Sequence, residues 1–294
     1  MKKNNIVPDG LILLHKRPGV TSFDALRDIK RLMDSGRVGH TGTLDKFAEG
    51  LLLVLTGRAL KLSRWFTHCD KQYEGTIRFG AETDTLDPEG SVIAGAPLPS
   101  REAVEQALSR FTGEIEQAPP AYSAIHIDGE RSSNLARRGE AVEMKNRPVT
   151  IYRLELLSWE PPDARIFVHC SGGTYIRSLA RDIALAAASR AHLCALVRTR
   201  VALFRLEDAV LGTGLQSLRL IDKGVFAALN IPCVDISRED AQKVVRGKPL
   251  TQILQNTSLP RENPAAALFA DGEFIAMIEF ANNTWNYGYV YARD

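Results

Sequence analysis

One carboxylate stands at the end of a stretch rich in glycine and threonine, where Gly39 to Leu44 lead directly to Asp45. Two glycines permit sharp backbone turns, so the stretch predicts an ordered loop that presents the carboxylate just before an apolar segment. An aspartate after a loop is also a common helix cap, and His40 in such a loop commonly bonds to backbone. The stretch therefore indicates either a lone catalytic carboxylate or a structural cap.

Two other segments carry side chains that could act together with a carboxylate. Tyr73 begins the alternating residues 73–79, which predict a strand, although a tyrosine on such a strand normally belongs to the core. Arg177 falls in the first turn of a helix predicted to begin near Tyr175, where a cation opposes the helix dipole at a cost of about 0.3–1 kcal/mol. A carboxylate partner would offset that cost, whereas Arg181, one turn later, is expected to be a solvated side chain.

Several other chemistries are disfavoured because their sequence signatures are absent. The chain contains neither a G-x-x-x-x-G-K-[ST] phosphate loop nor a G-x-S-x-G nucleophile elbow. The deaminase pattern is missing, and the histidines lack the spacing of metal ligands. The four cysteines include no C-x-x-C pair, so we expect reduced thiols rather than a zinc site or a disulfide framework.

The composition is that of an ordinary globular protein, with 294 residues of which 45% are hydrophobic and 24% charged. The net charge of +2 is too small to indicate a nucleic-acid partner. Basic side chains nevertheless cluster locally and could follow a phosphate backbone: Arg27, Lys30 and Arg31; Arg131, Arg137 and Arg138; Lys145 and Arg147; Arg198 and Arg200. The apolar runs are too short for a membrane span or a signal peptide, so we expect a cytoplasmic protein without membrane contact.

The elements that must position these groups follow from apolar periodicity and turn residues. Strands are expected at 11–14, 50–57, 73–79 and 166–170, and helices at 22–33, 59–66, 99–112 and from 175 onward. One face of the first helix is apolar and predicted to be buried: Phe23, Leu26, Ile29 and Met33. Residues 36–46 are expected to form an ordered loop, and residues 117–150 an exposed insertion or long loop.

The character of the chain changes near Ile231-Pro232. Beyond this point short strands are expected over 266–280 and 287–292, around turns at Asp271-Gly272 and Asn282-Asn283. Roughly sixty residues are enough for a small autonomous module. We therefore divide the chain into a larger domain over 1–230 and a small β module over 231–294.

The sequence resembles the TruB family, the bacterial tRNA pseudouridine-55 synthases. The resemblance covers about residues 10–205 and consists of motifs in the order of the family: Lys16 to Ser22, Gly39 to Asp45 followed by Ala48 to Leu52, the Tyr73 strand, Thr83 to Asp87, Pro119 to Ala124, Arg147 to Val149, Cys170 to Asp182 and Ala191 to Leu193. The chain also departs from the usual pattern of the family. His15 stands in place of aspartate, Lys46-Phe47 in place of Pro-Leu, and Gly173 and His126 in place of frequent lysines.

The resemblance implies an α+β fold in which a mixed β-sheet with flanking helices forms the catalytic domain. It also implies that residues 117–150 are an RNA-gripping insertion and that residues 231–294 form a PUA-like RNA-binding domain. The implied partner is the TΨC arm of tRNA, bound by a monomer without an obligate protein partner. The implied reaction requires no cofactor and no metal.

The resemblance also assigns roles to individual side chains. Asp45 aligns with the essential aspartate, Tyr73 with the active-site tyrosine, and Arg177 with the arginine that pairs with the aspartate. The remaining assignments are positions that contact the substrate nucleotide or its surroundings: His40, Tyr73, Tyr175, Leu196 and Lys16.

Pseudouridine formation breaks the bond between the ribose and a base nitrogen, rotates the base and rejoins it through carbon. An ionised carboxylate can act as nucleophile at the anomeric carbon or as base at the neighbouring carbon, and the sequence leaves both roles open. A nearby Arg177 favours the charged form of Asp45. Tyr73 could stack on the base and help to remove its carbon-bound proton.

Two other functions stay open on the sequence alone. The chain could be a non-catalytic protein that binds or folds tRNA, and the departures around Asp45 are compatible with this. It could also be a carboxylate-dependent glycosidase, although no motif supplies a second carboxylate as acid. A guide-dependent synthase is disfavoured because the chain lacks long basic tails.

Overall fold

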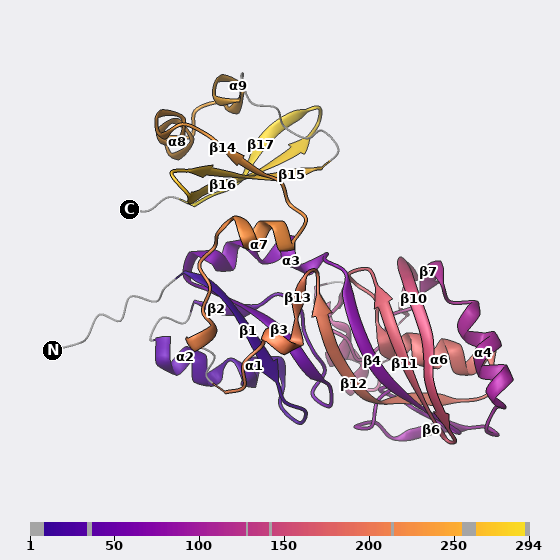
Figure 1. The fold of residues 1–294 in the computed structure, drawn as a ribbon. Helices are drawn as coiled ribbons and strands as arrows, with labels where there is room; N and C mark the ends of the chain where they lie inside the picture. Colours follow the sequence, from indigo (N-terminus) through magenta and orange to yellow (C-terminus); the bar gives the residue numbers. More distant parts are fainter. Residues whose placement is uncertain are drawn as a thin grey trace.

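The computed structural model describes residues 9–33, 37–127, 129–140, 143–212, 215–254 and 263–291. Within them the chain forms a large sheet in the order β1-β3-β12-β4-β11-β10-β7, with β2 beside β3 and β13 beside β12 (Figure 1). Only β3 and β12 run parallel among the described strand pairs of this sheet, so it is mixed, and the expected α+β fold is confirmed. The strands are β1 (Gly10–Lys16), β2 (Val38–His40), β3 (Glu49–Thr56), β4 (Lys71–Phe79), β7 (Gly113–Gln117), β10 (Arg147–Glu160), β11 (Asp163–Cys170), β12 (Ala191–Val201) and β13 (Phe204–Arg205).

Strands β3 and β4 differ in burial because β3 is covered on both faces, whereas β4 is covered on one. On β4 every second side chain is buried, as the alternation predicts for a strand with one covered face. On β3 one hydrophobic cluster includes Leu51, Leu53 and Leu55, while a second cluster on the opposite face includes Leu52 and Val54. Burial on both faces explains the continuous apolar sequence of β3.

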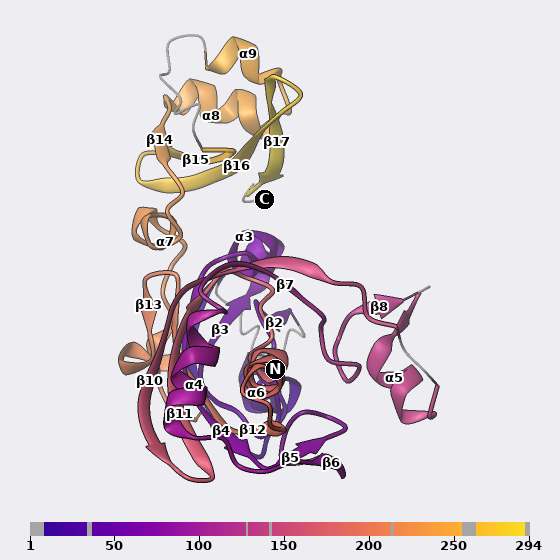
Figure 2. The same ribbon diagram turned by 90° about the vertical axis from the view of Figure 1, so that its right-hand side faces the viewer.

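Helices α4 (Arg101–Ser109) and α6 (Ile176–Ala186) lie on the same face of the large sheet (Figure 2). The buried stripe of α6, which includes Leu179 and Ile183, packs in one core with side chains of β4, β11 and β12. Tyr175 is the N-cap residue of α6, so the helix start predicted near this residue is confirmed. The sheet and α6 together determine where the first-turn residue Arg177 lies.

The helix predicted over 22–33 is divided in two. Helix α1 (Ser22–Ala25) begins at the Thr21 cap, and α2 (Arg27–Met33) follows after a break at Leu26. Leu26 and Ile29 are buried, but Phe23 is 69% exposed, so the prediction that Phe23 shares the buried face was wrong. The break changes the rotation of α1 relative to α2 and removes Phe23 from the apolar face. The burial of Met33 lies outside the described residues.

Three segments differ from the expected secondary structure. Residues 38–40 of the predicted loop pair with β3 as strand β2. The predicted insertion starts at the last residue of β7, ends inside β10 and contains β8 (His126–Ile127), β9 (Glu130–Arg131) and α5 (Ser132–Arg137) (Figure 2). The predicted helix at 59–66 is a 3₁₀-helix η1 (Gly57–Leu62) followed by α3 (Ser63–Thr67).

Strands β5 (Ala81–Thr83) and β6 (Val92–Gly95) form a separate hairpin before α4.

The second sheet has the order β14-β15-β16-β17, and its turns at Asp271-Gly272 and Asn282-Asn283 are as predicted. Its elements are β14 (Cys233–Asp235), α8 (Arg238–Val245), α9 (Leu250–Ile253), β15 (Ala265–Ala270), β16 (Glu273–Ala281) and β17 (Thr284–Val290). The sequence prediction missed α8 and α9. Phe226 of α7 (Lys223–Ala228) packs edge-to-face against Phe269 and at a tilt against Phe274 of this sheet. All three rings share a core with Leu11 and Phe66 of the larger part.

Two short 3₁₀-helices lie between β13 and α7, namely η2 (Leu206–Asp208) and η3 (Leu215–Ser217). None of the described helices has both the length and the hydropathy that a membrane span requires.

Candidate active site

Three buried side chains hold the loop that carries Asp45. The Ser22 hydroxyl donates to the Leu44 carbonyl at 2.9 Å and accepts from the Leu44 amide at 2.9 Å. The Lys16 ammonium donates to the Ala48 carbonyl at 2.6 Å, on the other side of Asp45. Hydrogen bonds from buried charged donors are strong, so the backbone on both sides of Asp45 is firmly positioned.

The Arg198 guanidinium is the third anchor of this loop. It is buried and donates to the carbonyls of Gly42 at 3.0 Å, Thr43 at 3.3 Å and Leu51 at 2.8 Å. The charge of Arg198 therefore faces inward, so this member of the basic clusters in the sequence is not available to a phosphate backbone. Gly50 makes this packing feasible, since a Cβ atom there would lie 2.4 Å from the Arg198 carbonyl oxygen.

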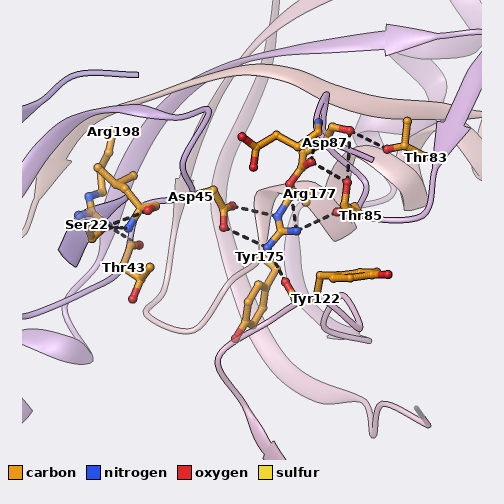
Figure 3. Close-up of polar contacts among 12 residues, drawn as sticks. Ser22, Thr43, Asp45, Thr83, Thr85, Asp87, Tyr122, Tyr175, Arg177 and Arg198 are labelled. Carbon is orange, nitrogen blue, oxygen red and sulfur yellow. Dashed lines mark hydrogen bonds and ion pairs between the residues drawn. The ribbon is translucent and has the colours of Figure 1, made fainter. Parts of the chain in front are cut away.

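Asp45 and Arg177, which are far apart in the sequence, form an ion pair (Figure 3). The Arg177 Nε atom lies 2.9 Å from Asp45 Oδ2, and Nη2 donates to Oδ1 at 3.1 Å. The Arg177 side chain is only 6% exposed, whereas the Asp45 side chain is 34% exposed. One carboxylate is thus held by a buried cation and remains accessible from solvent.

Arg177 also binds groups that the sequence analysis did not assign to the site. Its Nη1 atom donates to Asp87 Oδ2 at 3.3 Å and to the Thr85 carbonyl at 2.8 Å, and Nη2 donates to the Tyr122 carbonyl at 3.0 Å (Figure 3). Asp87 is itself buried and accepts hydrogen bonds from the Thr85 hydroxyl and the Glu89 amide. Asp87 belongs to the family motif Thr83 to Asp87, but nothing in this motif indicated that its partner is Arg177.

The ionisation of Asp45 depends on opposing effects. Burial raises the pKa of the Asp45 carboxyl and is the largest effect. The Arg177 guanidinium lowers the pKa, as expected from the sequence, and the neighbouring Asp87 carboxylate raises it. The net result is a pKa above the usual value, because the single arginine does not compensate for burial and a second carboxylate.

Tyr73 and Leu196 line the same region from neighbouring strands. Strand β4 pairs with β12 so that Tyr73 lies opposite Arg198 and Gly75 lies opposite Leu196. Burial raises the pKa of the Tyr73 phenol to about 12, against the opposing effect of the Arg198 guanidinium. Tyr73 is therefore a neutral phenol at physiological pH.

Three further residues predicted from the sequence lie close to this centre. His40 ends β2, where burial and the nearby Arg198 and Lys30 lower its pKa. Tyr175 precedes the helix that carries Arg177 and is half-buried. Lys16 differs from the expectation of a substrate contact, because its buried ammonium donates to backbone carbonyls of residues 17, 20, 46 and 48.

Two positions at which the chain departs from the usual family pattern have clear structural settings. Lys46 forms a partly exposed ion pair with Glu89 at 2.8 Å, which links the loop of Asp45 to the loop of Asp87. Gly173 has φ +88°, a conformation that glycine adopts readily and other residues adopt with strain. Across the described residues, no group of three or more histidine, cysteine, aspartate or glutamate side chains is arranged to bind a metal ion.

Gln117 is a further residue that the sequence analysis did not single out. Its side chain is buried at the end of β7 and binds the backbone of Tyr175 twice. Nε2 donates to the Tyr175 carbonyl at 3.1 Å, and Oε1 accepts from the Tyr175 amide at 2.8 Å. The N-cap residue Tyr175 makes no side-chain cap of its own, so Gln117 supplies these contacts and positions the start of α6.

Replacing Gln117 with leucine is expected to lower the free energy of unfolding by about 1–3 kcal/mol, because the partly buried amide and carbonyl of Tyr175 each lose a partner. Urea unfolding monitored by circular dichroism measures this change. Gln106→Leu, at an exposed position on α4, is the matched control. Equal stability of the two variants would show that Gln117 does not hold the start of α6.

Comparisons with known proteins identify the family of the chain. The family model for "TruB family pseudouridylate synthase (N terminal domain)" matches residues 30–176. The tRNA pseudouridine synthase B of Aromatoleum aromaticum is 39% identical over 284 residues, which cover 94% of this chain and 90% of that protein. The chain belongs to the TruB family of pseudouridylate synthases. The family resemblance predicted from the sequence is thereby confirmed.

Other TruB-family relatives match over a shorter part of the chain. The tRNA pseudouridine synthase B of Bordetella avium is 47% identical, over 76% of this chain and 92% of that protein. A solved structure matches over nearly the whole chain. It is a chain from a crystal structure of a Cbf5-Nop10-Gar1 complex, with a TM-score of 0.71 and 23% identity over 98% of this chain and 85% of that one. At this identity the structural match shows that the fold of the TruB-family chain is shared.

Proposed function

We propose that this chain isomerises uridine 55 in the TΨC loop of tRNA to pseudouridine, acting in the cytoplasm. The relatives that match over most of the chain carry the name tRNA pseudouridine synthase B. The observation that carries the proposal is the state of the Asp45 carboxylate. A buried arginine holds it in place, and 34% of the Asp45 side chain is exposed to solvent. An accessible carboxylate in a fixed position can meet the ribose of a bound nucleotide.

The proposed reaction uses the ionised form of Asp45. The carboxylate attacks the anomeric carbon or removes a proton from the neighbouring carbon, and the bond from ribose to base nitrogen breaks. The base then rotates, and its carbon bonds to the anomeric carbon. In the first route this displaces the carboxylate, and in the second route the neighbouring ribose carbon regains its proton. The proton on the base carbon leaves, and the ring nitrogen released from ribose gains a proton. Tyr73, as a neutral phenol, stacks on the base and assists that proton transfer through its hydroxyl.

The target nucleotide must leave its stack to reach Asp45, at a cost of a few kcal/mol. We assign His40, Tyr175 and Leu196 to the surroundings of the extruded nucleotide. Tyr175 interacts electrostatically with both members of the ion pair, Leu196 shares a hydrophobic cluster with Leu44, and His40 interacts with Arg198, which holds the Asp45 loop. Lys16 is assigned to positioning the Asp45 loop, since its ammonium is occupied by backbone carbonyls. These contacts would contribute shape and stacking, which suits recognition of an RNA loop.

Two other parts of the chain are proposed to bind RNA. The segment that starts the insertion is fixed to α6, because the Tyr122 carbonyl accepts from Arg177 and the Ala118 carbonyl accepts from Arg181. The insertion over residues 117–150 would grip the RNA loop beside the reacting nucleotide. Residues 231–294 are proposed to be a PUA-like module that contacts tRNA outside the loop.

A single-turnover assay with purified protein and an unmodified tRNA transcript tests the proposal. One pseudouridine at position 55 is the expected product, without guide RNA or a protein partner. A transcript with cytidine at position 55 serves as the control and should remain unmodified. Tight binding without conversion would favour the tRNA-folding alternative, and release of free uracil would favour a glycosidase.

A further inference from the structure

Phe23 is an exposed aromatic side chain beside the proposed active site. It is 69% exposed and belongs to none of the hydrophobic clusters of the described residues. Its neighbour Ser22 exchanges two hydrogen bonds with the backbone of Leu44, the residue directly before Asp45. The position of Phe23 relative to the catalytic loop is therefore fixed, although the ring itself does not contribute to the core.

Lys30 provides a cation at the same place. Its ammonium lies over the Phe23 ring, 4.1 Å from the ring centroid. The other two cations of α2 are paired, Arg27 with Asp24 and Arg31 with Asp28, whereas Lys30 has no carboxylate partner among the described residues. Lys30 also lowers the pKa of His40, which ends β2 shortly before the Asp45 loop.

The arrangement is suited to a nucleobase. Lys30 lies over one face of the ring, and the large exposed area of Phe23 leaves the other face open to solvent. Bases of any kind stack on exposed aromatic rings in single-stranded nucleic acids, and a neighbouring cation attracts the phosphate. A duplex offers no such base, because its bases are already stacked on one another.

We propose that Phe23 and Lys30 form a platform on which an unpaired base next to the target uridine stacks, with its phosphate bound by Lys30. The inference rests on the proposed function, because it takes an RNA loop as the substrate. It adds a binding site for a flanking nucleotide, outside the pocket that holds the reacting one. The occupant is a nucleotide of the same loop, since the platform is connected to Asp45 through only Ser22 and Leu44.

Steady-state kinetics on an RNA stem–loop with the target uridine test this platform. Phe23→Ala is expected to raise KM by about tenfold, the scale of one lost base–aromatic stack, while kcat changes less than about twofold. Phe23→Leu keeps an apolar side chain and should behave like the alanine variant, whereas Phe23→Trp should retain the wild-type KM. Leu220→Ala is the matched control, because Leu220 is also 69% exposed but aliphatic.

Lys30→Gln addresses the phosphate contact. It is expected to reduce the slope of log Kd against log salt concentration by about 0.7–1, the contribution of one neutralised phosphate. Direct binding of the stem–loop, measured by fluorescence anisotropy, is independent of turnover. If the wild-type protein binds the RNA but forms no pseudouridine, the proposed reaction fails while the platform is still tested by these Kd values.

Three results would overturn the platform. The first is an unchanged Kd and KM for Phe23→Ala. The second is an equal loss for Phe23→Trp and Phe23→Ala, which would exclude stacking as the cause. The third is an equal loss for Leu220→Ala, which would show that any exposed apolar side chain has this effect. Urea unfolding of each variant should match the wild type, because neither Phe23 nor Leu220 lies in a core cluster.

Discussion

Asp45→Asn is expected to lower the single-turnover rate of pseudouridine formation by at least about 10³-fold, the scale on which loss of a catalytic group acts. The amide has nearly the same shape as the carboxylate, so the loop should keep its structure. It carries no negative charge, and it is therefore a poor nucleophile and a poor base. Conversion of a radiolabelled transcript, followed at saturating enzyme, measures the rate.

The binding of tRNA should persist in this variant, with Kd within about threefold of the wild type, because one side chain among many contacts changes. Asp163→Asn is the matched control. Asp163 is also held by an arginine, Arg78, through two contacts of 2.8 and 2.7 Å, but it is the first residue of β11 and pairs with β4 five residues beyond Tyr73. A normal rate for Asp45→Asn would remove Asp45 from the mechanism.

The second large effect is expected for Arg177→Met. Loss of this cation leaves Asp87 buried without its partner, and the free energy of unfolding should fall by about 3–5 kcal/mol. The reaction should slow by about 10²-fold or more at neutral pH, because more of Asp45 is protonated and its carboxylate is no longer oriented. Urea unfolding and single-turnover kinetics measure the two effects separately.

The pH dependence of the rate distinguishes a role in ionisation from a purely structural one. Asp45 must be ionised, so the rate falls as the pH decreases through its pKa, which burial already raises. Arg177 lowers this pKa, so its removal should move the acid limb of the profile to higher pH. Asp87 raises the pKa, so Asp87→Asn should move the acid limb in the opposite direction.

Arg177→Lys keeps the positive charge, so it replaces Arg177→Met in the kinetic measurements if the methionine variant folds poorly. It should keep the acid limb closer to that of the wild type, but it cannot reproduce the two-point contact with Asp45 and should still react slowly. Arg165→Met is the control, because Arg165 forms an exposed ion pair with Glu74 on the sheet. Identical pH profiles for all these variants would show that Arg177 does not control the ionisation of Asp45.

The sequence was sufficient for the features that depend on local pattern. Alternation of apolar residues predicts β4 with Tyr73 facing inward, because successive side chains of a strand point to opposite faces and only one face of this strand is covered. Apolar spacing likewise predicts the start of α6, and the family motifs assign Asp45 and Arg177 to one centre. Local pattern misplaced Phe23, because the break at Leu26 has no clear signal in the residues around it.

The tertiary structure alone determined how the site is supported. Asp87, Gln117 and Arg198 are separated from Arg177, Tyr175 and Gly42 by 90, 58 and 156 residues, and nothing in their own neighbourhoods specifies these partners. The resemblance assigns Lys16 to the substrate, and Arg198 belongs to a basic cluster that could follow a phosphate backbone. Folding nevertheless turns both cations inward, where backbone carbonyls of the Asp45 loop accept their hydrogen bonds. Residue type and local periodicity determine which chemistry is available to this chain. The packing of distant segments determines which charges are buried, and burial decides whether a charged group supports the loop or remains open to substrate.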